Sequence, residues 1–186
     1  MRRAKRVAGL VLAAGLAPAA AAPDSLPGLF ATSPMPGGAE RLSLFAPLLG
    51  HWRYDYRFRD AGGHVIEQGT GTWDFAWIVN GRSMQDVQTF RTAAGALSEF
   101  GTTLRVPQPD GSWRVVWDGP MRRNFCELTA RRASEDIRMD GHCNGDPALE
   151  RWVFSDVGSG SFQWRGYLSP DAGRHWRLEE EISARR

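Results

Sequence analysis

The chain has 186 residues, with 23 basic and 21 acidic side chains and a formal net charge of +2 at pH 7, and this near-neutral balance does not favour nucleic acid or an anionic membrane as a partner. Lys5 is the only lysine in the sequence, which excludes Schiff-base and lysine general-base chemistry from the rest of the chain. The length suits a leader followed by one domain of about 160 residues with a real core.

The first 21 residues have the pattern of a secretory signal peptide. Four basic residues among the first six precede an apolar run over 7–16 and an alanine-rich stretch. The run is shorter than the roughly 20 residues of a transmembrane helix. We expect cleavage after Ala21 rather than Ala22, because Pro23 would otherwise follow the cut directly. The mature protein is therefore expected in the periplasm or outside the cell, with no integral membrane segment and, at 19 basic against 21 acidic side chains, a net charge of −2.

Two segments precede the predicted strands. Residues 22–39 are rich in Pro, Gly and Ser, which indicates a flexible leader. Within 40–49, Leu42, Phe45 and Leu49 have helical spacing, and Pro47 limits a helix there to a turn or two. We predict that this short helix plugs the structured domain, which we place at 40–186.

From residue 51 onward the sequence reads as strands separated by short turns rich in Gly, Asp, Asn and Pro. It contains no helical period long enough to connect parallel strands, so each strand is predicted to pair antiparallel with its neighbour. The pattern gives about ten strands. Their predicted starts lie near residues 51, 64, 83, 98, 112, 122, 136, 148, 160 and 174.

One hairpin has a register that the sequence itself predicts. A turn at Ser134 and Glu135 places opposite each other the residues whose numbers sum to 269, so Cys126 faces Cys143. In an exported chain this placement favours a disulfide. Two free buried thiols are the second interpretation. Catalytic thiol chemistry is the third, since no neighbouring His with an orienting partner is evident.

A sheet of this many strands must close, split into a sandwich or leave its edges exposed. Aromatic residues in nearly every strand favour closure around a filled or partly filled interior. Gly69 and Gly71 lie mid-strand, where a long strand can bend around a barrel corner. The predicted fold is all-β, an antiparallel up-and-down meander closed into a barrel.

The two ends of the predicted barrel resemble a known superfamily. The stretch LLGHW, an apolar segment leading to Gly50 and Trp52, resembles the opening of lipocalin-like (calycin) barrels, and the chain ends EEEISARR. The resemblance implies that Arg185 or Arg186 closes the barrel over Trp52. Further stretches over 42–186, among them RWVFSDV, resemble a family of uncharacterised bacterial proteins of this type. The resemblance implies a fold and a cavity, and it implies no reaction.

The stretch GHWRYDYRFRDAGG at 50–63 alternates between two faces, and we expect its aromatic face to point into the barrel. A barrel of ten strands is wider than its own side chains readily fill. The parity argument predicts a largely aromatic interior, although core packing is the alternative for each ring taken alone. The residues predicted to point inward are Trp52, Tyr54, Tyr56, Phe58, Met84, Asp86, Gln88, Phe90, Phe100, Thr102, Leu104, Trp152, Phe154, Phe162, Trp164, Trp176, Leu178, Glu180 and Ile182. The predicted ligand-binding residues are Tyr54, Tyr56, Phe58, Met84, Asp86, Gln88, Thr102, Trp164 and Glu180.

Two of these residues are carboxylates, which in such an interior must be paired, hydrated or protonated. The alternative for Asp86 and Glu180 is a salt bridge with an inward arginine such as Arg105 or Arg151, or a hydrated position at the rim. All four histidines, which are His51, His64, His142 and His175, are predicted to face outward or lie beside turns. We therefore expect no metal site, no haem and no other cofactor.

Three functions from different classes remain open. The first is an exported barrel that binds a small apolar or amphipathic molecule in its cavity. The second is a cyclase, isomerase or hydratase that uses Asp86 or Glu180 as acid and base and Tyr54 or Tyr56 as an oxyanion donor. The third is a structural barrel without a ligand. The sequence leaves the oligomeric state open.

Overall fold

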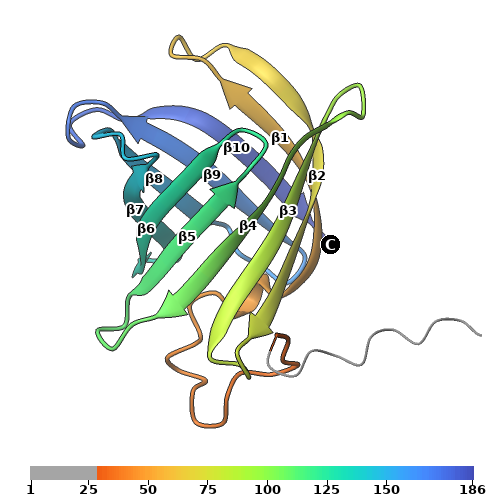
Figure 1. Ribbon diagram of the computed structural model, residues 1–186, viewed down its shortest axis with the longest axis vertical. Helices are drawn as coiled ribbons and strands as arrows, with labels where there is room; N and C mark the ends of the chain where they lie inside the picture. The colour runs from red at the N-terminus through yellow and green to blue at the C-terminus, as the bar shows by residue number, and fades with distance from the viewer. Residues whose placement is uncertain (1–28) are drawn as a thin grey trace, which may run out of the picture.

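The computed structural model describes residues 29–186, so the predicted signal peptide and the first part of the leader lie outside the described residues. Ten antiparallel strands form one closed barrel, in which β1 also pairs with β10 (Figure 1). This confirms the predicted all-β meander closed into a lipocalin-like barrel. The strands are β1 (Gly50–Arg59), β2 (Val65–Ile78), β3 (Ser83–Thr92), β4 (Leu97–Pro107), β5 (Trp113–Gly119), β6 (Asn124–Ala133), β7 (Asp136–Cys143), β8 (Leu149–Ser155), β9 (Ser161–Ser169) and β10 (Arg177–Arg185).

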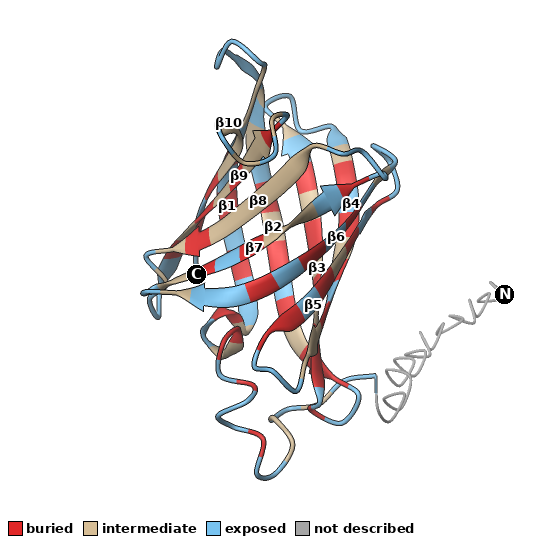
Figure 2. Ribbon diagram, turned by 90° about the vertical axis from the view of Figure 1, so that its left-hand side faces the viewer, coloured by how far each residue is buried: buried red, intermediate tan, exposed pale blue. Residues whose placement is uncertain are grey.

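The strands begin within three residues of their predicted starts, because polar turn residues define where each one ends. After β1, for example, the Asp60 carboxylate accepts the backbone N–H groups of Gly62 and His64, both at 2.9 Å. Along β1, buried and exposed residues then alternate, as expected for a strand with one face in the core. Figure 2 shows the same alternation in other strands as red bands between pale ones.

The predicted plug helix over 40–49 is wrong. The segment consists of turns followed by one 3₁₀ turn, η1 (Ala46–Leu48), because Pro47 lacks the N–H group that a longer helix needs there. The segment still closes the lower end of the barrel in Figure 1, since Leu42, Phe45 and Leu48 are buried. No helix in the described part of the chain is long and apolar enough to cross a membrane.

Part of the predicted leader contacts the barrel. The backbone N–H of Ala31 donates to the Trp77 carbonyl at 2.9 Å, and that of Met35 donates to the Gly81 carbonyl at 3.0 Å. These bonds hold residues 31–35 against the β2–β3 end of the barrel. Residues 31–35 therefore contact the barrel, although they precede the predicted start of the domain at residue 40.

The β6–β7 hairpin has the predicted register, with Cys126 opposite Cys143. The two cysteines form a disulfide with a Cα–Cα distance of 4.0 Å, which confirms the first of the three interpretations. Ser134, in the predicted turn, has a φ of 58°, the left-handed conformation that allows such a tight connection. The disulfide cross-links the end of the barrel opposite the plug segment.

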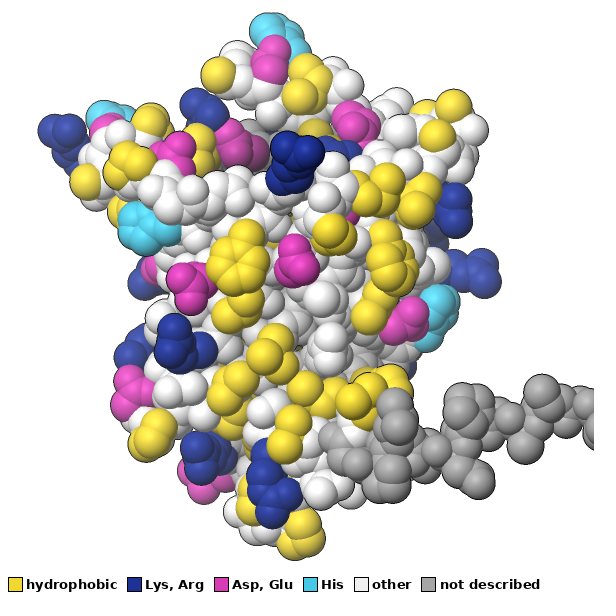
Figure 3. All heavy atoms as spheres, in the orientation of Figure 1, with side chains coloured by type: hydrophobic (Ala, Val, Ile, Leu, Met, Phe, Trp, Pro, Cys, Tyr) yellow, Lys and Arg dark blue, Asp and Glu magenta, His cyan; other side chains and the backbone are white. Residues whose placement is uncertain are grey.

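The prediction for the face of β4 is wrong. Glu99, Thr103 and Arg105 point inward, whereas Phe100 and Leu104 are 50% and 38% exposed. Thr102 also lies on the outer face, where its hydroxyl donates to the Asp86 carbonyl at 2.6 Å. Apolar alternation fails here because the inward polar groups have partners inside the barrel. Figure 3 shows exposed hydrophobic side chains scattered among charged ones on the outer wall.

The predicted inward parity of β10 holds only from Glu180 onward. A bulge at Glu179 shifts the pairing, so that Leu178 lies opposite Tyr167 while Glu180 lies opposite Gly166. Trp176 precedes the strand and is half-buried. A bulge adds one residue to one strand only, which reverses the two faces on its far side.

The mid-strand glycines of β2 allow a close approach. A Cβ atom on Gly71 would lie 2.2 Å from Cζ of Tyr54, and one on Gly69 would lie 1.8 Å from the Arg91 carbonyl oxygen. Real Cβ atoms do not approach so closely. These two positions therefore let the ring of Tyr54 lie flat across the wall of the barrel and let β3 pack tightly on β2.

Candidate ligand-binding cavity

The barrel contains an interior cavity of about 70 Å³ in the half that lies away from the plug segment. One part of its lining is aromatic and comes from β1, β2, β3, β5, β8 and β9. The other part is polar and comes mainly from β3, β4, the β5–β6 loop and β10. The lining residues are Phe58, Trp73, Phe90, Trp117, Trp152 and Trp164 on the aromatic side, and Gln88, Glu99, Thr103, Arg105, Arg122, Asn124 and Glu180 on the polar side.

The aromatic side is a packed wall. The rings of Trp152 and Trp164 lie 5.6 Å apart, and those of Trp73 and Trp164 lie 6.3 Å apart, both with edges directed at faces. Phe58 and Phe90 continue the wall at 5.9 Å. Such contacts hold each ring in one orientation. The cavity is therefore a preformed space with large, fixed apolar surfaces.

A buried ion pair forms the floor of the cavity. Arg105 and Asp86, each 1% exposed, form a salt bridge between β4 and β3. The Arg105 guanidinium also lies 5.0 Å from the ring centroid of Phe45 and 5.3 Å from that of Phe75. The predicted alternative for Asp86, an ion pair with an inward arginine, is thus the one observed. Arg151 instead pairs with Asp140 at 2.7 Å.

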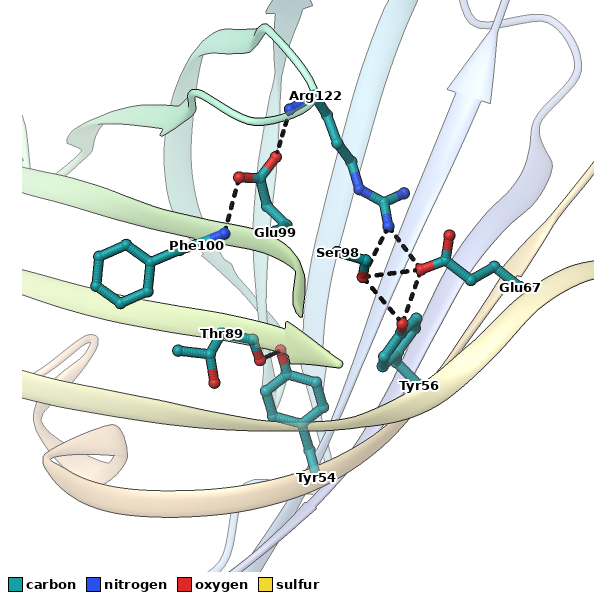
Figure 4. Close-up of polar contacts among 8 residues, drawn as sticks. All are labelled: Tyr54, Tyr56, Glu67, Thr89, Ser98, Glu99, Phe100 and Arg122. Atoms are coloured by element: carbon teal, nitrogen blue, oxygen red, sulfur yellow. Dashed lines mark hydrogen bonds and ion pairs between the residues drawn. The ribbon is translucent and has the colours of Figure 1, made fainter. Parts of the chain in front are cut away.

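Glu99 is a second buried carboxylate, and it is 2% exposed. It accepts the backbone N–H groups of Phe100 and Arg122 at 2.8 and 2.9 Å (Figure 4), and that of Met121 at 3.2 Å. These three bonds stabilise the carboxylate by hydrogen bonding. They also hold the β5–β6 loop, and with it the side chain of Arg122, over the cavity.

Four polar side chains join at the mouth of the cavity, as Figure 4 shows. The Glu67 carboxylate accepts hydrogen bonds from Tyr56 at 2.7 Å, Ser98 at 3.1 Å and Arg122 at 2.6 Å. Burial acts to raise the pKa of Glu67, but these hydrogen bonds outweigh it and hold that pKa below its ordinary value. Arg122 also lies 4.3 Å from the ring centroid of Phe58, so the cluster spans the opening.

Both interior tyrosines use their hydroxyl groups elsewhere. Tyr54 donates to the Thr89 carbonyl at 2.6 Å, and Tyr56 donates to Glu67. Burial raises the pKa of Tyr54 far above its ordinary value and raises that of Tyr56 to about 12. Each phenol is therefore protonated, and its hydroxyl group already donates a hydrogen bond within the protein. Neither lines the cavity.

Glu180 is one of four lining residues with a buried polar atom that has no hydrogen-bond partner among the described residues. Its Oε1 atom is buried and has no hydrogen-bond partner among residues 29–186. Burial raises the pKa of Glu180 to about 8; Arg122 opposes this rise, and the carboxylates of Glu150, Glu67 and Glu179 add to it. Burial, followed by Glu179, also raises the pKa of Glu150 to about 7. The mouth therefore holds carboxyl groups that titrate near neutral pH.

The opposite end of the barrel is sealed. Trp52 is fully buried and donates from its indole N–H to the Leu48 carbonyl at 2.6 Å. The guanidinium of Arg186 lies 4.3 Å from the Trp52 ring centroid and donates to the Leu49 carbonyl at 2.8 Å. Arg185 instead forms an exposed ion pair with Asp55 at 2.6 Å. The contact that the resemblance implied is thus made by Arg186.

Four of the nine predicted ligand-binding residues line the cavity, namely Phe58, Gln88, Trp164 and Glu180. Tyr54, Tyr56, Met84, Asp86 and Thr102 do not. The expected common pocket of both tyrosines, Asp86 and Glu180 is therefore not formed. Sequence reasoning missed Glu99 and Thr103 because it inverted the face of β4, and it considered Arg105 only as a partner for a buried carboxylate. It missed Arg122 and Asn124 because they lie at a turn, where alternation carries no signal.

The histidines and acidic residues form no metal site that the structure reveals. All four histidines are exposed, as predicted. No group of three or more His, Cys, Asp and Glu within residues 29–186 has the geometry to hold a metal ion. The polar side of the cavity is instead made of carboxylates, amides and guanidinium groups.

Comparisons with known proteins support the fold alone. A scan against models of protein families and a search of curated proteins both find no match. Among solved structures, "Crystal Structure of Rv2717c from M. tuberculosis" aligns with a TM-score of 0.58 at 14% identity, covering 78% of this chain and 96% of that one. A second structure, "Structure of EF1p2_mFAP2b bound to DFHBI", aligns over 78% of this chain and 98% of that one at 10% identity. Its TM-score of 0.42 is too low to support any inference.

Proposed function

We propose that the protein is an exported member of the lipocalin-like barrels that binds a small amphipathic molecule in the interior cavity. The disulfide and the pattern of the first 21 residues support export. One observation carries the binding proposal. The barrel keeps a preformed space with a fixed aromatic wall on one side and, on the other, buried polar atoms that lack partners in the described chain.

Those atoms favour a ligand over a merely structural interior. Gln88 and Trp73 are buried, and the Gln88 Nε2 and Trp73 Nε1 atoms have no hydrogen-bond partner within residues 29–186. Buried polar groups without partners are costly, and most native proteins satisfy them. The cavity brings these donors together beside Glu180. A molecule with an apolar body and polar groups would satisfy all three.

The size of the cavity limits the ligand. At roughly 10–15 Å³ for each water-sized sphere, a volume of about 70 Å³ has room for on the order of five waters or a comparably small number of non-hydrogen atoms. Drug-sized ligands occupy pockets of about 300–1,000 Å³. A larger ligand would first have to displace Arg122 from the mouth.

The contacts do not favour the enzymatic alternative as first formulated. It needs a tyrosine hydroxyl free to donate to an oxyanion, but both hydroxyls donate within the protein. It also needs a free interior carboxylate, and Asp86 is held by Arg105. Of the two carboxylates proposed as acid or base, only Glu180 lines the cavity; Glu99, which also lines it, accepts three backbone N–H groups.

Native mass spectrometry of protein purified from its own host tests the binding proposal. We expect a mass excess that disappears when the protein is unfolded. Thr103→Met would extend a side chain into the cavity. It should reduce the fraction of protein that carries the mass excess at least about tenfold. Thr102→Met places the same side chain on the outer face of the same strand and serves as the control. Wild-type protein without a mass excess, or equal excess in both variants, would contradict the proposal.

A further inference from the structure

We infer that the cavity selects a small organic cation, such as a protonated amine with an apolar body. This inference rests on the proposed binding function and specifies the chemistry of its ligand. It follows from the balance of charges in the lining, from the nature of the cavity wall, and from the contacts that each charged group already makes.

Four charged side chains line the cavity, two of each sign. The guanidinium groups belong to Arg105 and Arg122, and the carboxylates belong to Glu99 and Glu180. Both guanidinium groups are neutralised by partners outside the lining, Arg105 by Asp86 and Arg122 by Glu67. An anionic ligand would have to compete with these existing ion pairs.

The two carboxylates have no ion pair of their own within the described chain, and Arg122, which acts electrostatically on Glu180, is already paired with Glu67. Neither Glu99 nor Glu180 forms a salt bridge with any residue in the described range 29–186. The hydrogen-bond donors to the Glu99 carboxylate are the backbone N–H groups of Phe100, Met121 and Arg122, which carry no formal charge. Together with the partners Asp86 and Glu67, the cavity and its immediate surroundings hold four carboxyl groups against two guanidinium groups. A low dielectric constant in the cavity strengthens the attraction of these carboxyl groups for a cation.

The wall of the cavity suits the same class of ligand. Four indole rings and two phenyl rings surround the space. The faces of aromatic rings attract cations, Trp most strongly, and desolvated sites of this kind bind alkylammonium groups. An anion would meet the same faces with repulsion. Glu180 then supplies the acceptor for an ammonium N–H, since its Oε1 is buried and has no partner within the described chain.

The unpartnered donors do not oppose this assignment. Trp73 and Gln88 lie opposite each other on β2 and β3, and each carries a donor without a partner among the described residues. Both groups are neutral, so they leave the charge balance unchanged. The other donor of the lining without a partner in the described chain, Nε of Arg105, belongs to a guanidinium group that Asp86 already neutralises. Trp73 and Gln88 mark a place for an acceptor atom on the far end of the ligand.

A pair of probes with the same shape tests the charge. Tert-butylammonium and tert-butyl alcohol each have five non-hydrogen atoms and differ mainly in charge. We would titrate both into the full chain at about pH 9 and constant ionic strength, and follow the indole N–H signals in ¹H–¹⁵N spectra. The ammonium ion is expected to bind about tenfold or more tightly than the alcohol, as for a desolvated charge pair.

Two neighbouring substitutions locate the effect. Glu180→Gln should weaken tert-butylammonium about tenfold and leave tert-butyl alcohol within about twofold. Glu179→Gln removes a carboxylate from the adjacent bulge, outside the lining, and should change both affinities less than about threefold. Melting curves establish that both variants fold, and the wild-type comparison of the two probes does not depend on either variant.

The outcomes separate this inference from the proposed function. If the alcohol binds as tightly as the ammonium ion, or if Glu180→Gln leaves the ammonium affinity unchanged, the cation inference is wrong and the binding function stands. If neither probe binds at millimolar concentration, both are contradicted. Selective binding of the ammonium ion that depends on Glu180 supports both.

Discussion

Replacing Glu180 by Gln should make the protein more stable at high pH, although the substitution removes a charged residue. The pKa of Glu180 is about 8 in the folded protein, against an ordinary value of 4.5. Because this pKa is raised on folding, the associated stability is fully present below about pH 4.5 and is lost as the pH rises to about 8.

The size of the effect follows from the two pKa values. One pKa unit corresponds to about 1.4 kcal/mol, so the difference from 4.5 to about 8 sets an upper limit of about 5 kcal/mol. The side chain as a whole is partly exposed at the mouth, and water there reduces the penalty. We therefore expect about 2–3 kcal/mol in the free energy of unfolding.

Urea unfolding at about pH 4, 6 and 9 measures this quantity. The free energy of unfolding of Glu180→Gln should exceed that of the wild type by a margin that grows by about 2–3 kcal/mol between pH 4 and pH 9 and levels off above pH 8. Glu150, whose pKa is about 7, titrates in the same window and affects both proteins. Glu179→Gln should show a smaller gain than Glu180→Gln, because Glu179 only adds to the raised pKa values of Glu180 and Glu150. A difference between wild type and Glu180→Gln that is the same at pH 4 and pH 9 would refute the reasoning, because it would mean that Glu180 is hydrated.

Three further predictions concern the rest of the barrel. Thiol titration of the unfolded, unreduced protein should find no free thiol, and reduction should cost about 3 kcal/mol, since the disulfide closes a loop of 17 residues. Trp52→Ala should cost about 3–5 kcal/mol in thermal unfolding through the cavity it leaves. Arg186→Ala should cost about 1–2 kcal/mol and Arg185→Ala less than about 1, and equal losses would contradict the contact over Trp52. Asp86→Leu should cost about 3–5 kcal/mol in urea unfolding, and a second substitution, Arg105→Met, should recover most of it; simple additivity would argue against a buried pair.

The order of the strands could be predicted because turns carry strong local signals. Gly, Asp, Asn and Pro are frequent in the turns that end the strands, and many of the residues between the turns alternate in polarity. The disulfide followed from the same logic, since a short turn fixes the register of the hairpin around it. These features depend on neighbours within a few residues, which a single sequence displays directly.

The polar part of the cavity could not be predicted because its pattern depends on contacts between distant residues. On β4 the inward residues are Glu99, Thr103 and Arg105, and the outward ones include Phe100. Alternation assigns the apolar residue to the interior, so it placed Phe100 inside, although the possible ion pair of Asp86 with Arg105 could be named from the sequence. The bulge at Glu179 likewise reverses the inward and outward faces of β10, and no local sequence pattern indicates it.

The two halves of the interior differ in packing, and the buried ion pair of Arg105 and Asp86 lies between them. Toward the plug segment, Trp52, Phe45 and Phe75 pack closely, and this half accounts for stability. Toward the mouth, polar atoms without partners in the described chain surround a space, an arrangement that costs stability. Arg105 belongs to both, since it contacts the rings of Phe45 and Phe75 and also lines the cavity. Substitutions at the sealed end should therefore lower stability with little effect on the probes, whereas substitution of Glu180 should change probe affinity and raise stability.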